Sequence, residues 1–557
     1  MRTLPRLILC LTVALAPFPC SAQADPALVR RIDSIFSAVD RITTPGCAVG
    51  VDRAGVAVVR RAYGMANLET MTPWTVGTLS ESGSVAKQFT AAALVLLARD
   101  GVLSLDDDIA KWIPETKSIG KRITIRHLLT HTSGLPDRYT LHAMEQRAAG
   151  EVDHNNAEVM DVVSRLRELN FDPGEDYLYS NTGYIVAATV LERASGKSLQ
   201  AFTDARIFKP LGMTAVWRED HRAVVPGRAS AYTRAGTVWR NDHPFTRVIG
   251  SGGLLVTVDD FLKWLAAMQQ GGDPWGAVRD SLERMGKLND GTELDYGLGV
   301  GASTVRGVRR VAHTGSTGGY RSALVRYPDQ RIALAFLCNG GSAVPGDLGP
   351  RLASAVLGST LAAVPAEPSP YTGGSNGITP SQLAGAYHAP RTEEVMVLYL
   401  RNGQLADSTA NNVELIPVAA DRFKYRGSDR HLTVLPAAGG APTRVRLEAP
   451  NTRAVEYVSV SRDKPSAQIL AGYAGTYRSP ELGSSYQVSV SGDTLRLERG
   501  WRGNLTLRPL YRDGFLAGPI GIVRFTRNPQ GRVTGFVVWA GRVRHLRFDK
   551  QGPGTRD

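Results

Sequence analysis

The chain has 557 residues, of which 43% are hydrophobic and 21% charged, and its formal net charge is +13. This length exceeds what one hydrophobic core supports, so we expect two to four domains. The composition excludes wholesale disorder, and no stretch after the N-terminus has the length and apolarity of a membrane span.

The first 24 residues have the pattern of an export signal. Two arginines precede a short apolar run from Leu7 to Ala16, and Ala22-Gln23-Ala24 is a small-residue cleavage site. Cleavage there would leave Asp25 as the first residue, which predicts a periplasmic or secreted protein. An uncleaved membrane anchor is disfavoured, because the run is shorter than the roughly 20 residues that cross a bilayer.

Residues 25–364 are expected to form one large unit that mixes strands and helices. The expected elements are a hairpin of Cys47–Val51 and Val56–Arg60, a helix that stops at Asp100-Gly101, a helix over Ile185–Ser195, and strands over Ser322–Tyr327 and Ile332–Leu337. Strands at both ends with helices between them indicate an α+β fold.

Two cysteines follow the signal, Cys47 and Cys338. They are too few for a disulfide framework, and their spacing matches no metal site. Both lie in apolar, strand-like runs. One bond between them in an oxidising compartment and two buried free thiols are therefore both open.

The strongest local motif is Ser84-Val85-Ala86-Lys87. A serine and a lysine three residues apart on a helix share one face. The serine hydroxyl becomes a good nucleophile only when a neighbour takes its proton, and lysine does this only where burial lowers its pKa. By itself the pattern is weak, because a helix-capping serine with a solvated lysine has the same spacing.

Two further motifs carry chemistry. Tyr179-Ser180-Asn181 offers a phenol for proton transfer and an amide for a substrate carbonyl. His313-Thr314-Gly315-Ser316 is expected on an edge strand beside the site, where glycine lets a substrate backbone approach. The backbone N–H groups of Ser316 and Ser84 would form an oxyanion hole. A packed loop tyrosine and a structural histidine are the alternatives for each motif alone.

Metal sites are not expected. His127 and His131 lie four residues apart, but no glutamate stands between them in the metalloprotease position. Asp106-Asp107-Asp108 is interpreted as a solvated helix start and not as a calcium site.

Residues 365–380 are rich in proline and glycine, which predicts a linker. The chain that follows is β-rich and duplicated. The matches are Leu383–Tyr387 with Tyr473–Tyr477, the turn Asn402-Gly403 with Gly492-Asp493, and Pro417 and Phe423 with Pro509 and Phe515. Two small antiparallel β-barrels are predicted, over residues 381–464 and 465–557, with a single irregular sandwich as the alternative.

In this order, Ser84-x-x-Lys87, Tyr179-x-Asn181 and His313-Thr314-Gly315 resemble the serine β-lactamase and penicillin-binding protein superfamily. The branch it looks most like joins class C β-lactamases with D,D-peptidases, esterases and D-aminopeptidases. Supporting stretches are His127–Pro136, Gly250–Leu254 and Tyr296–Gly299. The resemblance spans about residues 28 to 360 and implies an antiparallel sheet flanked by helices.

The resemblance also implies a covalent acyl-enzyme mechanism that needs no metal or organic cofactor. Ser84 would be acylated, and Lys87 and Tyr179 would share the acid and base work. Substrate contacts would come from Asn181, His313, Thr314, Gly315 and Ser316. Which of Lys87 and Tyr179 is the base stays open.

One departure concerns substrate choice, because His313 stands where typical β-lactamases have lysine. A neutral imidazole holds a substrate carboxylate less firmly. This favours D-aminopeptidase, D,D-peptidase or esterase activity over β-lactam hydrolysis; a non-enzymatic envelope-binding protein is a further alternative. The architecture is similar to that of D-stereospecific aminopeptidases, in which a barrel loop reaches the active site and selects a free amine. Glu393-Glu394 is the candidate loop here.

The expected partner is a small-molecule or peptide substrate. Residues 471–557 hold fourteen Arg or Lys and six Asp or Glu, a net charge of +8. No nucleic-acid motif accompanies this charge. An anionic cell-envelope surface is therefore the candidate macromolecular partner, and an inert basic surface is the alternative. The oligomeric state is not indicated.

Overall fold

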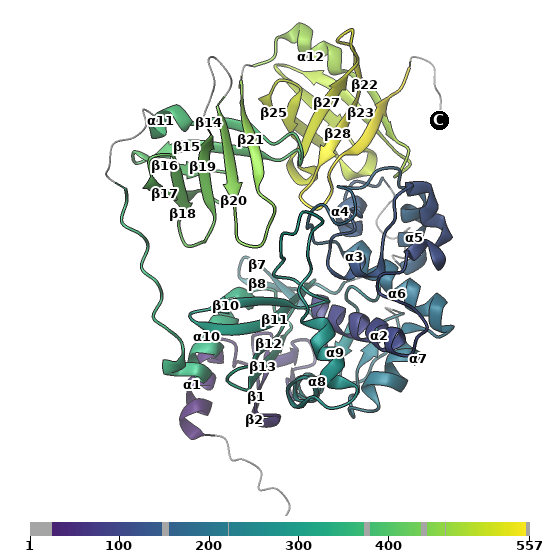
Figure 1. The fold of residues 1–557 in the computed structure, drawn as a ribbon, viewed down its shortest axis with the longest axis vertical. Coiled ribbons are helices and arrows are strands. Elements are labelled where there is room, and N and C mark those ends of the chain that lie inside the picture. The colour runs from purple at the N-terminus through teal and green to yellow at the C-terminus, as the bar shows by residue number, and fades with distance from the viewer. Residues whose placement is uncertain are drawn as a thin grey trace, which may run out of the picture.

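The computed structural model describes residues 25–146, 155–220, 222–244, 246–371, 379–435, 443–462 and 464–552 (Figure 1). The predicted export signal and residues 372–378 of the predicted linker lie outside the described residues. Within them, a mixed α+β unit is followed by two β-barrels, as predicted. None of the described helices combines the length and apolarity needed to cross a membrane.

A six-stranded antiparallel sheet forms one half of the first unit, with strand order β10-β11-β12-β13-β1-β2. The strands are β1 (Cys47–Arg53), β2 (Val56–Tyr63), β10 (Gly301–Val305), β11 (Val308–Thr317), β12 (Tyr320–Tyr327) and β13 (Ile332–Cys338). The central strand β13 is buried at every position, because helices α1 (Pro26–Phe36) and α10 (Pro345–Leu357) cover one face and α8 (Val258–Gln270) covers the other. The predicted hairpin and the two predicted late strands are present.

The strand that carries His313 was predicted at the sheet edge, and this is wrong. β11 is an interior strand, because β10 pairs with it over Val308–Ala312. β10 ends there, so residues 313–317 continue past its end and pair only with β12. The motif therefore keeps one open side although its strand is not the edge.

Helices form the other half of this unit. They are α2 (Lys87–Arg99), α3 (Ile125–Leu129), α4 (Arg138–His142), α5 (Asn156–Arg165), α6 (Asn181–Ser195), α7 (Leu199–Thr203) and α9 (Trp275–Leu282), with short helical turns η1 (Gly83–Ala86), η2 (Ile109–Lys111), η3 (Pro114–Ile119), η4 (Asp204–Phe208) and η5 (Gly358–Thr360). Small strand pairs complete it: β3 (Met65–Asn67) with β4 (Thr72–Pro73), β7 (Tyr232–Ala235) with β8 (Val238–Asn241), and β9 (Leu254–Val256) between β5 (Ser80–Glu81) and β6 (Val216–Trp217). α2 and α6 are apolar around most of their circumference because they lie in the core.

Each barrel is a closed sheet of eight strands. The first follows α11 (Pro380–Leu383) and contains β14 (Gly385–His388), β15 (Val395–Arg401), β16 (Gln404–Asp407), β17 (Val413–Ala419), β18 (Arg422–Tyr425), β19 (His431–Leu435), β20 (Arg444–Glu448) and β21 (Val455–Val460). The second follows α12 (Ala467–Tyr473) and contains β22 (Gly475–Ser479), β23 (Ser484–Ser491), β24 (Thr494–Glu498), β25 (Asn504–Tyr511), β26 (Gly514–Leu516), β27 (Ile522–Arg527), β28 (Val533–Trp539) and β29 (Leu546–Lys550), with turns η6 (Gly500–Arg502) and η7 (Gly518–Ile520).

The sequence duplication is a structural repeat. The phenol of Tyr387 donates to the carbonyl of Leu383 at 2.9 Å, and that of Tyr477 donates to the carbonyl of Tyr473 at 2.6 Å. The register also shifts after Pro417 in one barrel and after Pro509 in the other, opposite equivalent phenylalanines. The single-sandwich alternative is thereby excluded.

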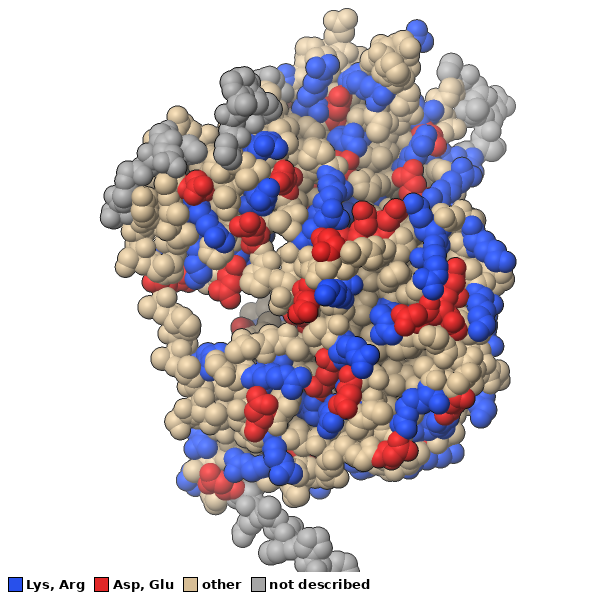
Figure 2. Space-filling model, viewed as in Figure 1, with Lys and Arg blue, Asp and Glu red and all other residues tan. Residues whose placement is uncertain are grey.

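Part of the positive charge of the second barrel is paired. Arg524, Arg527, Arg544 and Arg547 each form an ion pair with a carboxylate. Figure 2 shows basic side chains interspersed with acidic ones on the visible face, without one continuous basic patch. Binding to an anionic envelope surface stays an expectation.

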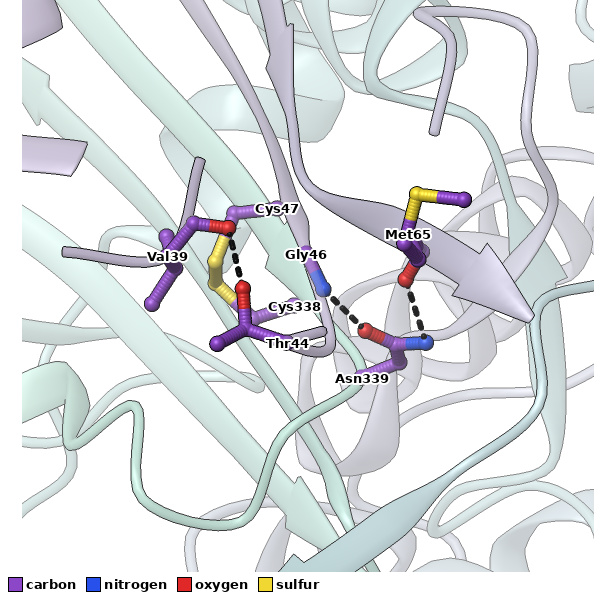
Figure 3. Close-up of a disulfide and its surroundings, with 7 residues drawn as sticks. All are labelled: Val39, Thr44, Gly46, Cys47, Met65, Cys338 and Asn339. Atoms are coloured by element: carbon purple, nitrogen blue, oxygen red, sulfur yellow. Dashed lines mark hydrogen bonds between the residues drawn. A yellow bond between two sulfur atoms is a disulfide. The ribbon is translucent and has the colours of Figure 1, made fainter. Parts of the chain in front are cut away.

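The two cysteines form a disulfide that joins β1 to β13 (Figure 3). Cys47 and Cys338 are direct cross-strand partners with Cα atoms 4.1 Å apart. Next to the bond, the amide of Asn339 accepts from Gly46 N–H at 2.8 Å and donates to the Met65 carbonyl at 3.2 Å. Of the two alternatives for the thiols, the structure has the bonded one.

Reduction of this disulfide is expected to lower the free energy of unfolding by about 2–5 kcal/mol. The bond closes a loop of 291 residues, so it removes much conformational freedom from the unfolded chain. Urea unfolding of the wild type with and without a reductant measures the difference. A Cys47→Ala/Cys338→Ala variant, which should not respond to the reductant, is the control. Equal midpoints for oxidised and reduced wild type would contradict the prediction.

Candidate active site

Ser84 lies at the junction of strand β5 and helix α2, in the first turn of η1. Gly83 precedes it with φ +50°, and a Cβ there would lie 2.7 Å from the backbone nitrogen of Ser316. Glycine therefore lets η1 approach strand β11 closely. N–H groups in the first turn of a helix have no partner inside the helix. Ser84 and Ser316 therefore lie side by side in the lining of one pocket.

Lys87 is fully buried one turn after Ser84. Its Nζ lies 2.7 Å from the carbonyl oxygen of Ser251, 2.9 Å from Oδ1 of Asn181 and 3.1 Å from Oγ of Ser84. Burial holds the pKa of Lys87 well below its usual range. The two carbonyl oxygens can only accept, so a neutral amine spends both N–H groups on them. In that neutral state, the lone pair of Lys87 is the part of the amine left for the Ser84 hydroxyl.

The orientation of Asn181 is set by Asp137, a residue outside the three predicted motifs. One carboxylate oxygen of Asp137 accepts from the backbone N–H and from the side-chain Nδ2 of Asn181, each at 2.8 Å. A carboxylate only accepts, so the amide oxygen must face Lys87. Asp137 also caps α4, and a helix cap after Leu135-Pro136 was the one signal that could have indicated it.

Tyr179 presents a buried phenol whose hydroxyl has no hydrogen-bond partner among the described residues. Burial raises its pKa, and the nearby Ser84 hydroxyl and the Arg542 guanidinium act in the opposite direction. Lys87 Nζ lies 4.9 Å from the ring centroid, and Cζ of Arg542 lies 4.6 Å from it. At neutral pH the phenol is protonated, while the burial of Lys87 favours a free amine.

His313 lines the pocket, but protein groups occupy both its ring nitrogens. Nδ1 lies 2.7 Å from the Thr314 carbonyl oxygen, so Nδ1 carries the proton and Nε2 accepts from the Tyr296 hydroxyl at 3.0 Å. Burial lowers the pKa of His313 to about 3, so the ring is neutral at pH 7. The imidazole therefore supplies no positive charge for a substrate carboxylate.

The other histidines and aspartates considered for metals have structural partners. Nδ1 of His131 accepts from Ser180 N–H at 3.1 Å, and Nδ1 of His127 accepts from Thr124 N–H at 3.3 Å. Asp108 caps η2, and Asp106 pairs with Arg126. In the part of the chain that the structure describes, no group of three or more such side chains could hold a metal ion.

The pocket around these residues has a volume of about 460 Å³. Its lining is Glu81, Gly83, Ser84, Tyr139, Tyr179, Asn181, Arg218, Thr246, Val248, Ser251, Gly252, Gly253, His313, Thr314, Ser316, Thr317 and Arg542. Of the predicted site residues, Lys87 and Gly315 lie behind this wall. Two features of the lining carry no motif in the sequence: the buried Glu81–Arg218 ion pair, with 3.1 Å between the charged atoms, and Arg542.

The predicted role of Glu393-Glu394 is wrong, because neither lines the pocket. Glu393 pairs with Arg524 and His388, and Glu394 accepts from Tyr457 at 2.7 Å and pairs with Arg544. Both carboxylates therefore connect the two barrels. A barrel loop does reach the site, but it is the loop between β28 and β29, and its residue in the pocket is basic.

The chain is similar to known proteins both over its α+β unit and over nearly its full length. A family model described as Beta-lactamase matches residues 32–357. Penicillin-binding protein 4* of Bacillus subtilis (strain 168) is 32% identical over 307 residues, covering 51% of this chain and 66% of that protein. The chain thus spans just under two thirds of that relative. A D-aminopeptidase of Brucella anthropi is 25% identical over 535 residues, covering 91% of this chain and 96% of that protein.

The similarity of fold extends over the barrels. The crystal structure of SurE has a TM-score of 0.51 at 21% identity, and the match covers 94% of this chain and 99% of that chain. The Brucella anthropi relative likewise covers nearly the full length of this chain. The similarity to these proteins therefore includes the C-terminal region and is not limited to the three motifs of the α+β unit.

Proposed function

Because the chain belongs to the beta-lactamase family, we propose that it is a serine hydrolase that forms a covalent acyl-enzyme on peptides, amides or esters containing D-amino acids. The observation that carries the proposal is that the buried Nζ of Lys87 contacts Oγ of Ser84 and two carbonyl oxygens, those of Asn181 and Ser251. The relatives named D-aminopeptidase and penicillin-binding protein support the substrate class. Hydrolysis of β-lactams is not favoured, because His313 is neutral and engaged.

In the proposed acylation step, Oγ of Ser84 attacks the substrate carbonyl carbon while neutral Lys87 takes its proton. The N–H groups of Ser84 and Ser316 stabilise the oxyanion. The protonated Tyr179 then donates to the leaving amine or alkoxide as the carbon–heteroatom bond breaks, and it regains a proton from the Lys87 ammonium. Water releases the acyl group in a second step with the same acid and base. The structure thus favours Lys87 over Tyr179 as the resting base.

We also propose that the protein acts after export. The disulfide is typical of an oxidising compartment. Asp25, the residue that follows the predicted cleavage site, caps helix α1 by accepting from Ala27 N–H at 2.8 Å. Cleavage after Ala24 would therefore leave the first helix with its cap.

The proposed function predicts hydrolysis with D-stereopreference. Purified protein is assayed on D- and L-alanine p-nitroanilide, a D-Ala-D-Ala peptide, a short-chain p-nitrophenyl ester and nitrocefin, beside an enzyme-free blank. We expect at least tenfold higher kcat/KM for the D- than the L-anilide and slow nitrocefin turnover. Intact-protein mass spectrometry during turnover should show an acyl adduct. Equal rates for the two enantiomers would contradict the substrate class, and no hydrolysis of any substrate would contradict the activity.

A further inference from the structure

Four side chains in or behind the pocket are potential cations, and three of them offer no free charge. Lys87 lies behind the pocket wall with its Nζ held by three oxygens, and both ring nitrogens of His313 have protein partners. Arg218 is buried against Glu81, and its guanidinium also donates to backbone carbonyls at Pro244 and Thr246. The guanidinium of Arg542 lies over the Tyr179 ring, and among the described residues it has no ion pair or side-chain hydrogen bond. Arg542 is thus the one unpaired charge that the described pocket presents.

The loop that carries Arg542 is held against the first unit. The carbonyl of Arg542 accepts from Asp137 N–H at 3.2 Å and from Nδ2 of Asn170 at 3.1 Å. The N–H of Arg544 donates to Oδ1 of the same Asn170 at 2.6 Å. Its backbone is therefore bound on both sides, next to the residue that orients Asn181.

The barrel behind the loop is also anchored. Leu141, Met144 and Val162 of the first unit belong to the same buried cluster as the core of the second barrel. Asp176 pairs with Arg544, two residues after Arg542. The contact is therefore apolar and ionic, and it places Arg542 at a defined position in the pocket wall.

The side chain of Arg542 lies over the Tyr179 ring, with Cζ 4.6 Å from the centroid. A guanidinium stacked on an aromatic face keeps its N–H edge free for a planar acceptor. A carboxylate fits that edge with two parallel hydrogen bonds. Because the side chain is exposed to the pocket, a substrate reaches it without displacing protein groups.

We propose that Arg542 selects substrates that carry a carboxylate, and that it supplies from the second barrel the positive charge that His313 does not. This rests on the proposed function and narrows its substrate class to anionic D-amino-acid peptides. A loop that selected a free amine would need an acidic residue at this place. The carboxylate has two sources, the C-terminus of the substrate or an acidic side chain next to the scissile bond.

Two matched substrate pairs test this. The first is D-Ala-D-Ala and its C-terminal amide, and the second is D-glutamyl and D-glutaminyl p-nitroanilide. The readout is a ratio within each pair: kcat/KM for the substrate with the carboxylate divided by kcat/KM for its amide counterpart. Any general effect of Arg542 on Tyr179 or Lys87 changes both values and cancels in this ratio. Wild type is compared with Arg542→Gln, with Arg542→Lys, which keeps the charge, and with Arg508→Gln, an exposed arginine of the same barrel.

The ratio is expected to fall roughly 10- to 100-fold in Arg542→Gln for the pair that contains the recognised carboxylate. Arg542→Lys should keep part of the wild-type preference for the carboxylate, and Arg508→Gln should keep all of that preference. The pair that responds identifies the source of the carboxylate. Unchanged ratios in both pairs, with hydrolysis intact, would overturn the inference and leave the proposed function standing. Absence of wild-type hydrolysis on these four substrates, with activity on the ester or the D-alanine anilide, would also overturn the inference alone, whereas absence of hydrolysis on every substrate would overturn the proposed function.

Discussion

Replacing Ser84 with alanine is expected to reduce hydrolysis by roughly 10⁴-fold or more, to the level left by substrate binding and the oxyanion hole. The variant keeps the backbone N–H of residue 84 but has no atom that can be acylated. The side chain is small and borders the pocket, so the fold should persist. Steady-state rates on the preferred D-substrate measure the loss, and intact mass should show no adduct.

The matched control is Ser80→Ala, four residues earlier on β5. The Ser80 hydroxyl is buried, has no hydrogen-bond partner among the described residues and does not line the pocket. We expect this variant to retain activity within a few fold. Residual hydrolysis in Ser84→Ala comparable to that of the control would mean that another group carries the reaction.

Replacing Lys87 with methionine is expected to slow acylation by roughly 10³-fold, because the general base is lost while side-chain length is kept. Lys87→Arg should fail equally, since a guanidinium holds its proton throughout the accessible pH range. In the wild type, kcat/KM should rise with pH on an acid limb well below the usual lysine pKa, because burial lowers the pKa of Lys87. An active Lys87→Arg variant would contradict the role of Lys87 as base.

The Lys87→Met variant also tests how the free energy of unfolding depends on pH. Between the lowered pKa of Lys87 and its unfolded value near 10.5, the unfolded chain binds one more proton than the folded chain. The wild type therefore gains stability as pH rises through this window, by up to about 1.4 kcal/mol per pH unit. Lys87→Met lacks this term, so the stability difference between the two proteins should shift toward the wild type with rising pH. Urea unfolding at pH 7 to 10 measures it, and parallel curves would show that Lys87 is charged when folded.

The sequence predicts a site residue well when the residues that form its motif are close together along the chain. Ser84 and Lys87 lie one helical turn apart, so a short pattern contains both. The edge position of the His313 strand was wrong for a physical reason. Strand order depends on which segments pair, and the partner β10 has no motif of its own.

The sequence by itself determined the three motifs and their order, the α+β class of the first unit, and the repeat of two barrels. These depend on local spacing and on self-similarity, which a single chain displays. Only the tertiary structure decided that Cys47 bonds Cys338, that Asp137 orients Asn181, and that Arg542 enters the pocket instead of Glu393 or Glu394. In each case packing brings together residues that are far apart in the chain, and no short sequence pattern contains both partners.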